Sequence, residues 1–433
     1  MRGPGRGALA AAVMVAALSM GADAGAQALS FEQTVADLTA SDTDARLRAA
    51  QALKESPFPE SAVPLAKAIL DTDDRVQHEA ILAELNVFLA ERIVPRKRVG
   101  LVIEVRNRID AQSIFEGGWR ALDPRVVPDV VLTSLRTATR DDNPSIAAEA
   151  LYAFGALGAN VYGRERTALL AASSADLATV LGSADYRVRE AAVLVIARLY
   201  WRLPGDQAVD MTLGDGLVTT LNDRVPSIRR GALIALGALR YERGVQSLVD
   251  IVQHYGHGPD AVAAMFALSR IAHPSSLPLF NTALTGRDAL LKAAAIEGIA
   301  RGGDSSQAAR LAQAAAGDKN AEVQLSAHFA GAILSEGSIN ELVDGLAKPA
   351  LHDRALGLLS EVAPGRESTF APHMQDPKPA IRADLLDVLG LSNDPNLLTQ
   401  VERFLNDPDP MVARTATRAM FRLKGQGSPA ARP

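Results

Sequence analysis

The sequence contains no cysteine in its 433 residues. This absence excludes disulfide bonds, thiolate metal ligands, cysteine nucleophiles and lipid attachment through a cysteine. Aromatic residues are also scarce, at 4% of the chain against 48% hydrophobic residues overall. The net charge of −5 provides no basic excess, so a nucleic-acid partner is not expected. The core must therefore be built mainly from alanine and leucine, as in thin helical layers that pack closely.

What the chain does contain is one unit that recurs, with copies mostly 28 to 42 residues apart. The clearest copies start at Ile146, Val188, Ile228, Val323 and Val412. They have an acidic or Asn-Pro turn, followed by apolar residues at i, i+4, i+7, i+8 and i+11, and the other copies are looser. These offsets lie on one face of an α-helix. The first position of each copy, which we call its anchor, is Ala45, Val76, Ile146, Val188, Ile228, Asp260, Leu291, Val323, Leu351, Ile381 or Val412.

A repeat of this length predicts stacked two-helix units, because one unit cannot bury its apolar face without its neighbours. We therefore expect an all-α fold, an α-solenoid or superhelix of about eleven to twelve stacked repeats. Proline two residues before an anchor, as at Pro226, suits the first helical turn, and Asp or Asn three residues before it, as at Asp185, suits the N-cap. Gly237 and Gly302 fall near the predicted helix ends.

The N-terminal residues have the pattern of a secretory signal peptide, 1–26. Arg2 and Arg6 precede an apolar stretch, and small residues then offer cleavage near 26 or 28. The stretch is shorter than the ~20 apolar residues that cross a bilayer, so we expect cleavage, export and no remaining membrane span. Loss of two Arg and one Asp moves the net charge from −5 to about −6. The expected location is periplasmic, in a bacterial cell, or secreted.

The mature chain divides into four expected parts. Residues 29–92 hold the N-terminal repeats, and 93–140 form a divergent repeat with a basic cluster. The main array covers 141–424, and the Gly/Pro-rich residues 425–433 form a flexible C-terminal tail. For the basic cluster, a solvated helix face is favoured over a docking site. Its residues are Arg92, Arg96, Lys97, Arg98, Arg106 and Arg108.

The repeats resemble HEAT repeats, in particular the HEAT-like class named after the phycobilisome (PBS) lyases. The family pattern is roughly Asp-x-Asp/Pro-x-Val-Arg-x-x-Ala-x-x-Ala-Leu-Gly. It appears at 185–192 as Asp-Tyr-Arg-Val-Arg-Glu-Ala-Ala, at 226–237 as Pro-Ser-Ile-Arg-Arg-Gly-Ala-Leu-Ile-Ala-Leu-Gly, and at 376–382 as Asp-Pro-Lys-Pro-Ala-Ile-Arg. The resemblance covers nearly the whole mature chain except 91–140. It implies an armadillo-like helical scaffold that binds a protein or peptide partner along its curved surface.

Enzymes of this family are the alternative. Deoxyhypusine hydroxylases carry a His-Glu pair on each of four repeats, whereas this sequence has one such pair, His78-Glu79. One pair cannot supply the ligands for two irons, so a hydroxylase-like function is disfavoured. Nothing marks the pigment pocket of a phycobilin lyase. His254 and His257 lie in a Gly-rich turn that is expected to be a solvated loop, and no nucleophile or phosphate-binding motif occurs. We therefore expect no cofactor, no metal and no catalysis.

Candidates for partner binding are the scarce aromatic residues and the arginines, because Trp, Tyr and Arg are enriched in binding hot spots. Filling between repeats is an equally compatible role for the aromatics. The residue after an anchor is often basic, and pairing with turn aspartates is favoured over a cationic groove. The candidates are Trp119, Arg120, Arg189, Tyr200, Trp201, Arg229 and Tyr241. The residues after anchors are Arg46, Arg189, Arg229, Lys292, His352 and Arg382, and the turn aspartates are Asp42, Asp185, Asp223 and Asp376.

Overall fold

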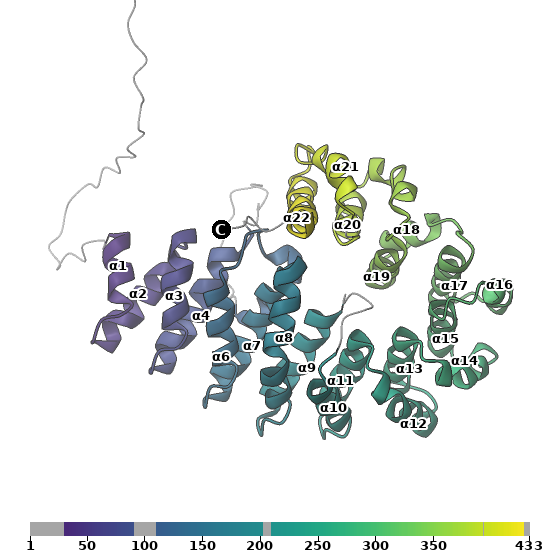
Figure 1. The fold of residues 1–433 in the computed structure, drawn as a ribbon, viewed down its shortest axis with the longest axis horizontal. Coiled ribbons are helices and arrows are strands. Elements are labelled where there is room, and N and C mark those ends of the chain that lie inside the picture. The colour runs from purple at the N-terminus through teal and green to yellow at the C-terminus, as the bar shows by residue number, and fades with distance from the viewer. Residues whose placement is uncertain (1–29, 91–109, 202–208, 393, 428–433) are drawn as a thin grey trace, which may run out of the picture.

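The computed structural model describes residues 30–90, 110–201, 209–392 and 394–427. Helices stack in two layers along a curved array (Figure 1), so the predicted all-α solenoid is confirmed. None of the described helices is long and apolar enough to cross a membrane. The predicted signal peptide and the basic cluster lie outside the described residues.

The first layer consists of the helices that begin at or beside the anchors. They are α2 (Thr43–Glu55), α4 (Asp74–Phe88), α7 (Pro144–Gly158), α9 (Tyr186–Tyr200), α11 (Pro226–Leu239), α13 (Pro259–Ile271), α15 (Ala289–Arg301), α17 (Ala321–Leu334), α19 (His352–Val362), α20 (Pro379–Leu389) and α22 (Pro410–Gly427). The last of these continues past residue 424, where the sequence analysis placed the start of a flexible tail.

The second layer holds the helices that precede them in each repeat. They are α1 (Phe31–Asp37), α3 (Ala62–Ala68), α6 (Asp129–Ala138), α8 (Gly163–Val180), α10 (Met211–Thr220), α12 (Val245–Tyr255), α14 (Leu277–Leu284), α16 (Ala308–Ala315), α18 (Asn340–Leu346) and α21 (Leu398–Glu402). A further short helix, α5 (Ala111–Glu116), packs against α7. Single 3-10 turns are η1 (Pro59–Ser61), η2 (Trp119–Ala121), η3 (Glu242–Gly244), η4 (Pro274–Ser276), η5 (Ser305–Gln307), η6 (Glu367–Phe370), η7 (His373–Gln375) and η8 (Pro395–Leu397).

The anchors face the space between the two layers, as their spacing predicts. Those that are buried are Val76, Ile146, Val188, Ile228, Leu291, Val323, Leu351, Ile381 and Val412. One anchor was wrong: in α13 the buried residue is Ala261, and Asp260 instead pairs with arginines of α11. The reason is that Gly258 is the N-cap of α13, and the buried position comes three residues after the cap, as it does at Ile228.

The helix starts follow the predicted capping chemistry. Side-chain oxygens of Asp42, Asp73, Asn143, Asp185, Asp288 and Asn320 accept hydrogen bonds from free N–H groups of the first turn. Gly302 is the C-cap of α15, as expected. Gly237 is not a helix end, because α11 continues to Leu239. A Cβ on Gly237 would lie 2.9 Å from the Cα of Ala267, so glycine is needed there for the close approach of α13.

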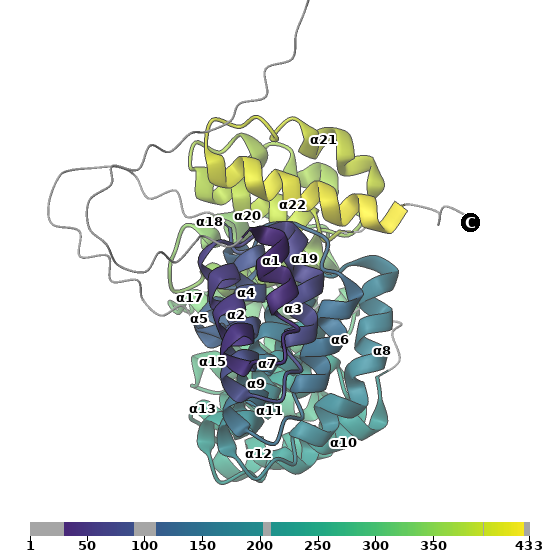
Figure 2. The same cartoon turned by 90° about the vertical axis from the view of Figure 1, so that its left-hand side faces the viewer.

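The array curls back on itself. From α7 onward the helices follow a ring, and α22 returns to the side of α8 (Figure 1). Arg418 of α22 donates a hydrogen bond to the carbonyl of Leu122, 296 residues earlier in the chain, at 3.0 Å. Helices α1 to α4 project beyond this closure, and we call them the arm. In the view turned by 90°, the C-terminal helices α20 to α22 lie at one end of the molecule (Figure 2).

Candidate functional site: the inner face and the seam of the ring

Charged side chains occupy the first-layer face that is turned into the ring. They stand at i+3, i+6 and i+10 from the anchors, on one helix face that is about a quarter turn from the apolar stripe. Glu297 is such a residue in α15, Arg354 in α19, and Asp384 and Asp387 in α20. All three carboxylates are buried, so the chain must pair them with cations.

The first contact across the ring is made by Arg354 of α19. Its guanidinium donates hydrogen bonds to Glu297 of α15 and to Glu322 of α17. It also donates to the hydroxyl of Ser326 at 2.9 Å and lies 4.7 Å from the ring centroid of Phe266 in α13. One side chain thus ties α19 to three helices of the array.

The second contact is made by Glu361, near the other end of α19. Its carboxylate accepts hydrogen bonds from Arg301 at 2.7 Å and from Arg270 at 3.2 Å. Burial by itself raises the pKa of Glu361, but the two guanidiniums outweigh it, so the pKa lies below the ordinary value. Arg270 also covers the Trp201 ring, 3.8 Å from its centroid, and donates to the Trp201 carbonyl at 2.9 Å. We call the Arg354 and Glu361 clusters together the strut.

The ring closes where η2 meets α20 and α22, and we call this contact the seam. Arg120 donates hydrogen bonds to Asp384 and, at 3.2 Å, to Asp387. The indole N–H of Trp119 donates to Asp387 at 2.9 Å, and Arg422 donates to the same carboxylate at 3.3 Å. Residues 119–120 are thereby joined to residues more than 260 positions later.

The seam is electrostatically built around Asp387, whose side chain is 0% exposed. Burial alone raises the pKa of Asp387, but Arg422, Arg120 and Arg418 together hold it below the ordinary value. The carboxylate is therefore charged, and it neutralises part of an arginine cluster. Removing one partner from such a cluster leaves an uncompensated buried charge, which is far more costly than losing an exposed ion pair.

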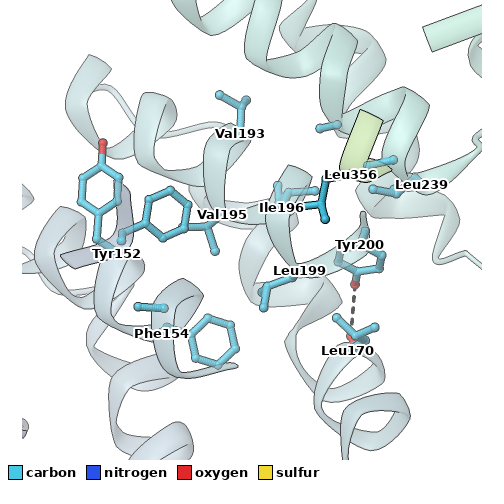
Figure 3. Packing of buried hydrophobic residues seen from close by; sticks show 14 of the residues in the cluster. Tyr152, Phe154, Leu170, Val193, Val195, Ile196, Leu199, Tyr200, Leu239 and Leu356 are labelled. Carbon is cyan, nitrogen blue, oxygen red and sulfur yellow. Dashed lines mark hydrogen bonds between the residues drawn. The ribbon is translucent and has the colours of Figure 1, made fainter. Parts of the chain in front are cut away.

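Three of the predicted partner-binding residues therefore lie in contacts within the chain. Trp119 and Arg120 form the seam, and Trp201 forms part of the strut. These residues lie in two separate regions of the sequence, and the structure brings both regions close to the C-terminal helices α19 to α22. Figure 3 shows Leu356 of α19 alongside Leu239 of α11 in the same buried cluster.

Tyr200 and Tyr241 are buried and fill space between repeats. The Tyr200 hydroxyl donates to the carbonyl of Leu170 at 3.2 Å (Figure 3). The Tyr241 hydroxyl donates to Asp215 at 2.5 Å, and burial together with this carboxylate raises the pKa of Tyr241 to about 12. Neither ring is presented to a partner, so inter-repeat filling, the other role considered for the aromatics, describes these two.

Arg189 and Arg229 belong to a ladder of ion pairs between successive repeats. Five of the six basic residues that follow anchors reach an aspartate at or just before the first-layer helix of the next repeat, which confirms that pairing with aspartates is favoured. The pairs are Arg46–Asp71 at 2.6 Å, Arg189–Asp223 at 2.6 Å, Arg229–Asp260 at 3.3 Å, Lys292–Asp318 at 2.9 Å and Arg382–Asp407 at 2.8 Å. Asp42 and Asp185 cap their own helices instead, and Asp376 accepts the N–H of Lys378. His352 departs from the ladder and faces Asp384 in the seam at 3.0 Å.

The histidine pair considered for metal binding is used structurally. His78 lies 2.6 Å from Glu149 of α7, and Glu79 accepts a hydrogen bond from Lys54. Within the part of the chain that the structure describes, no cluster of three or more His, Cys, Asp or Glu is placed to hold a metal ion. One open cavity of about 440 Å³ lies between α16, α17 and α18, and another of about 410 Å³ lies beside α11 and α12. The first is lined largely by alanine and glycine.

The comparisons with known proteins concern the fold. No protein-family model and no curated protein matches the sequence. A crystal structure of an engineered protein is similar over 91% of this chain and 98% of its own, with 18% identity and a TM-score of 0.46. A designed armadillo repeat protein in complex with the peptide (KR)4 is similar over 63% of this chain and 98% of its own, with 17% identity and a TM-score of 0.37. The chain is a helical repeat protein, and its membership of the HEAT-like class stays a prediction.

Proposed function

We propose that the protein is an exported, non-catalytic HEAT-like scaffold that binds a protein partner, with the outside of the arm as the main contact. The predicted partner binds along the curved surface, and because the strut occupies the inner face of the ring, we place the contact outside it. The observation that carries the proposal is a set of exposed apolar side chains on and next to α3 of the arm and α6, the helix that packs against α3. Large exposed apolar groups in one region are typical of protein-binding surfaces. The set, which we call the arm patch, is Phe58, Val63, Leu70, Val126 and Val130, with Val126 72% exposed.

The charges beside the arm patch indicate the chemistry of the partner. Three acidic residues near Phe58 and Val130 in the sequence are exposed: Glu55 at the end of α2, Glu60 in η1 and Asp129 at the start of α6. The nearby Arg125 is already paired with a carboxylate of its own loop. Lys67 is exposed between Val63 and Leu70 on the same face of α3, so the patch carries charges of both signs and fits an apolar partner segment with polar flanks.

The partner site is tested by cross-linking in cells followed by capture of the full-length protein from envelope extracts. A Phe58→Ser, Val126→Ser variant should lose most of the partner that the wild type retains. The matched control is Leu277→Ser, which removes an equally exposed apolar side chain from α14 on the ring. If the wild type and both variants recover the same amount of partner, the arm patch is not the binding site.

Export is tested separately, by the mass of the protein recovered from a bacterial host. Loss of 26 or 28 N-terminal residues and recovery outside the cytoplasm support the signal peptide. A full-length protein that stays in the cytoplasm would contradict export without affecting the arm patch. The control is a chain that begins after residue 28, which should remain inside the cell.

A further inference from the structure

The connection between α17 and α18 has the local features of a hinge. Glu336 adopts a left-handed backbone conformation with φ of 51°, which is strained for a residue other than glycine, and Gly337 follows it. Arg366 donates hydrogen bonds to the carbonyls of Ala332 at 2.5 Å and Gly337 at 2.8 Å. Arg366 lies between α19 and η6, so these bonds tie the segment beyond the hinge to the end of α17, and rotation must carry or release them.

Open space lies on the outer side of this hinge. The cavity of about 440 Å³ is bordered by α16, α17, the hinge residue Gly337 and the start of α18. Gly331 of α17 stands at i+8, where α11 has Leu236 and α15 has Ile299. A Cβ on Gly331 would meet no atom within 4 Å. The side chain that fills this position in other repeats is missing here, and the gap is what α18 would move into.

On the inner side, the same helices are fastened mainly by charged groups. Arg354 and Glu361 reach the array through the strut, and Asp384 and Asp387 reach Arg120 through the seam. A buried ion pair gains little net stability, because the cost of removing both charges from water offsets their attraction. Such contacts hold a closed state without making it irreversible.

We propose that helices α18 to α22 form a hinged lid, which closes the ring through the strut and the seam and opens by rotating outward into the gap beside Gly331. Opening exposes the inner face, including Trp201, Phe266 and Arg270. The lid gives the molecule two states, and the inner face is accessible in one of them. This inference does not depend on the arm patch, which lies outside the ring.

The two tryptophans of the chain provide the measurement, because one lies in the seam and the other in the strut. A Trp119→Phe background leaves Trp201 as the single fluorescent reporter on the inner face; because it also removes the hydrogen bond from Trp119 to Asp387, its scattering is first compared with that of the wild type. In this background, Arg120→Ala removes the hydrogen bonds to both seam aspartates. Acrylamide quenching of Trp201 should then rise, and the radius of gyration from solution scattering should increase. If Arg120→Ala folds and leaves both quenching and scattering unchanged, the proposal of a lid is overturned.

The hinge is tested by filling the gap. Gly331→Leu combined with Arg120→Ala should return the quenching of Trp201 to the value of the background protein, because α18 can no longer move outward. Quenching that stays high in the double variant would overturn the hinge assignment. The control is Arg187→Ala, which breaks an exposed ion pair with Asp185 away from the seam. It should leave both the quenching of Trp201 and the radius of gyration unchanged. If Arg120→Ala does not fold, Asp384→Asn replaces it with the same expected result. The assay contains no partner, so it is independent of the test of the arm patch.

Discussion

Replacing Glu84 by leucine should stabilise the arm. Glu84 lies in α4 at i+8, where Phe154, Ile196 and Leu236 fill the core of later repeats. Its side chain is 0% exposed, and neither carboxylate oxygen has a hydrogen-bond partner. Burial raises its pKa well above the ordinary value of 4.5, so the folded arm keeps the carboxyl proton to a higher pH than the unfolded arm does.

The magnitude follows from proton linkage. Below pH 4.5 the carboxyl is protonated in both the folded and the unfolded arm, so it contributes no pH dependence. Between that pH and the raised pKa of the folded arm, the unfolded arm loses the proton first. Each pH unit in this range lowers the free energy of unfolding by about 1.4 kcal/mol. Burial of this carboxyl without a hydrogen-bond partner lowers the stability of the folded arm by about 1–3 kcal/mol. Glu84→Leu removes this cost as well.

The assay must report on the arm alone, because distant repeats need not unfold together. Native-state hydrogen exchange of α4 amides, corrected for intrinsic rates, gives the local opening free energy at pH 4.5 and pH 7. Glu84→Leu should raise protection at both pH values, and more at pH 7. Glu84→Gln should remove the pH dependence and keep most of the polar burial cost. If the protection of α4 in the wild type does not fall from pH 4.5 to pH 7, the pKa of Glu84 is not raised by burial, and the reasoning is refuted.

Two further perturbations act on the hinge and the seam. Gly331→Ala should raise the local stability of α17 by about 1 kcal/mol, from helix propensity alone, because its Cβ meets open space. Gly298→Ala in α15 is the matched contrast and should destabilise, since its Cβ would lie 2.6 Å from a phenylalanine ring; both are read by hydrogen exchange. For His352, burial lowers the pKa, but hydrogen bonds to Asp353 and Asp384 outweigh it and raise the pKa above 6.5. Its attraction to the seam is therefore present below pH 6.5 and is lost as the pH rises through the raised pKa, so tryptophan quenching should increase over that range; a flat profile would contradict the role of His352.

The helical stripe and the caps could be predicted because both are local properties of the chain. The buried Val188 and the cap Asp185 stand three residues apart, and a single helical turn relates them. The one misplaced anchor, Asp260, lies in a repeat whose cap is Gly258, which offers no side-chain signal. Sequence reasoning failed there because the position was set by backbone geometry.

The seam could not be predicted in this way. Arg120 and Asp387 are 267 residues apart, and they meet because the small rotations of every intervening repeat add up to a closed ring. A partial signal was present. Glu297, Asp384 and Asp387 stand at i+3 or i+6 from their anchors, where repeated carboxylates mark a face that is neither core nor ordinary surface. The choice of partner for each carboxylate depends on the curvature, which no local pattern contains.

The chemistry of the lid contact differs from that of the other contacts along the array. Between α11 and α13 the joint is apolar and so close that Gly237 has no room for a side chain, and such a joint opens only by unfolding. Away from α17, which α18 packs against at Leu325, the lid meets the array through carboxylates and guanidiniums beside apolar groups such as Leu356. Apolar residues would close the ring more firmly, but an open ring would then expose a large apolar face to water. Charged groups are paired when the ring is closed and hydrated when the proposed lid is open, which reduces the difference in free energy between the two states. That balance explains why a single substitution at Arg120 is expected to shift the ring from one state to the other.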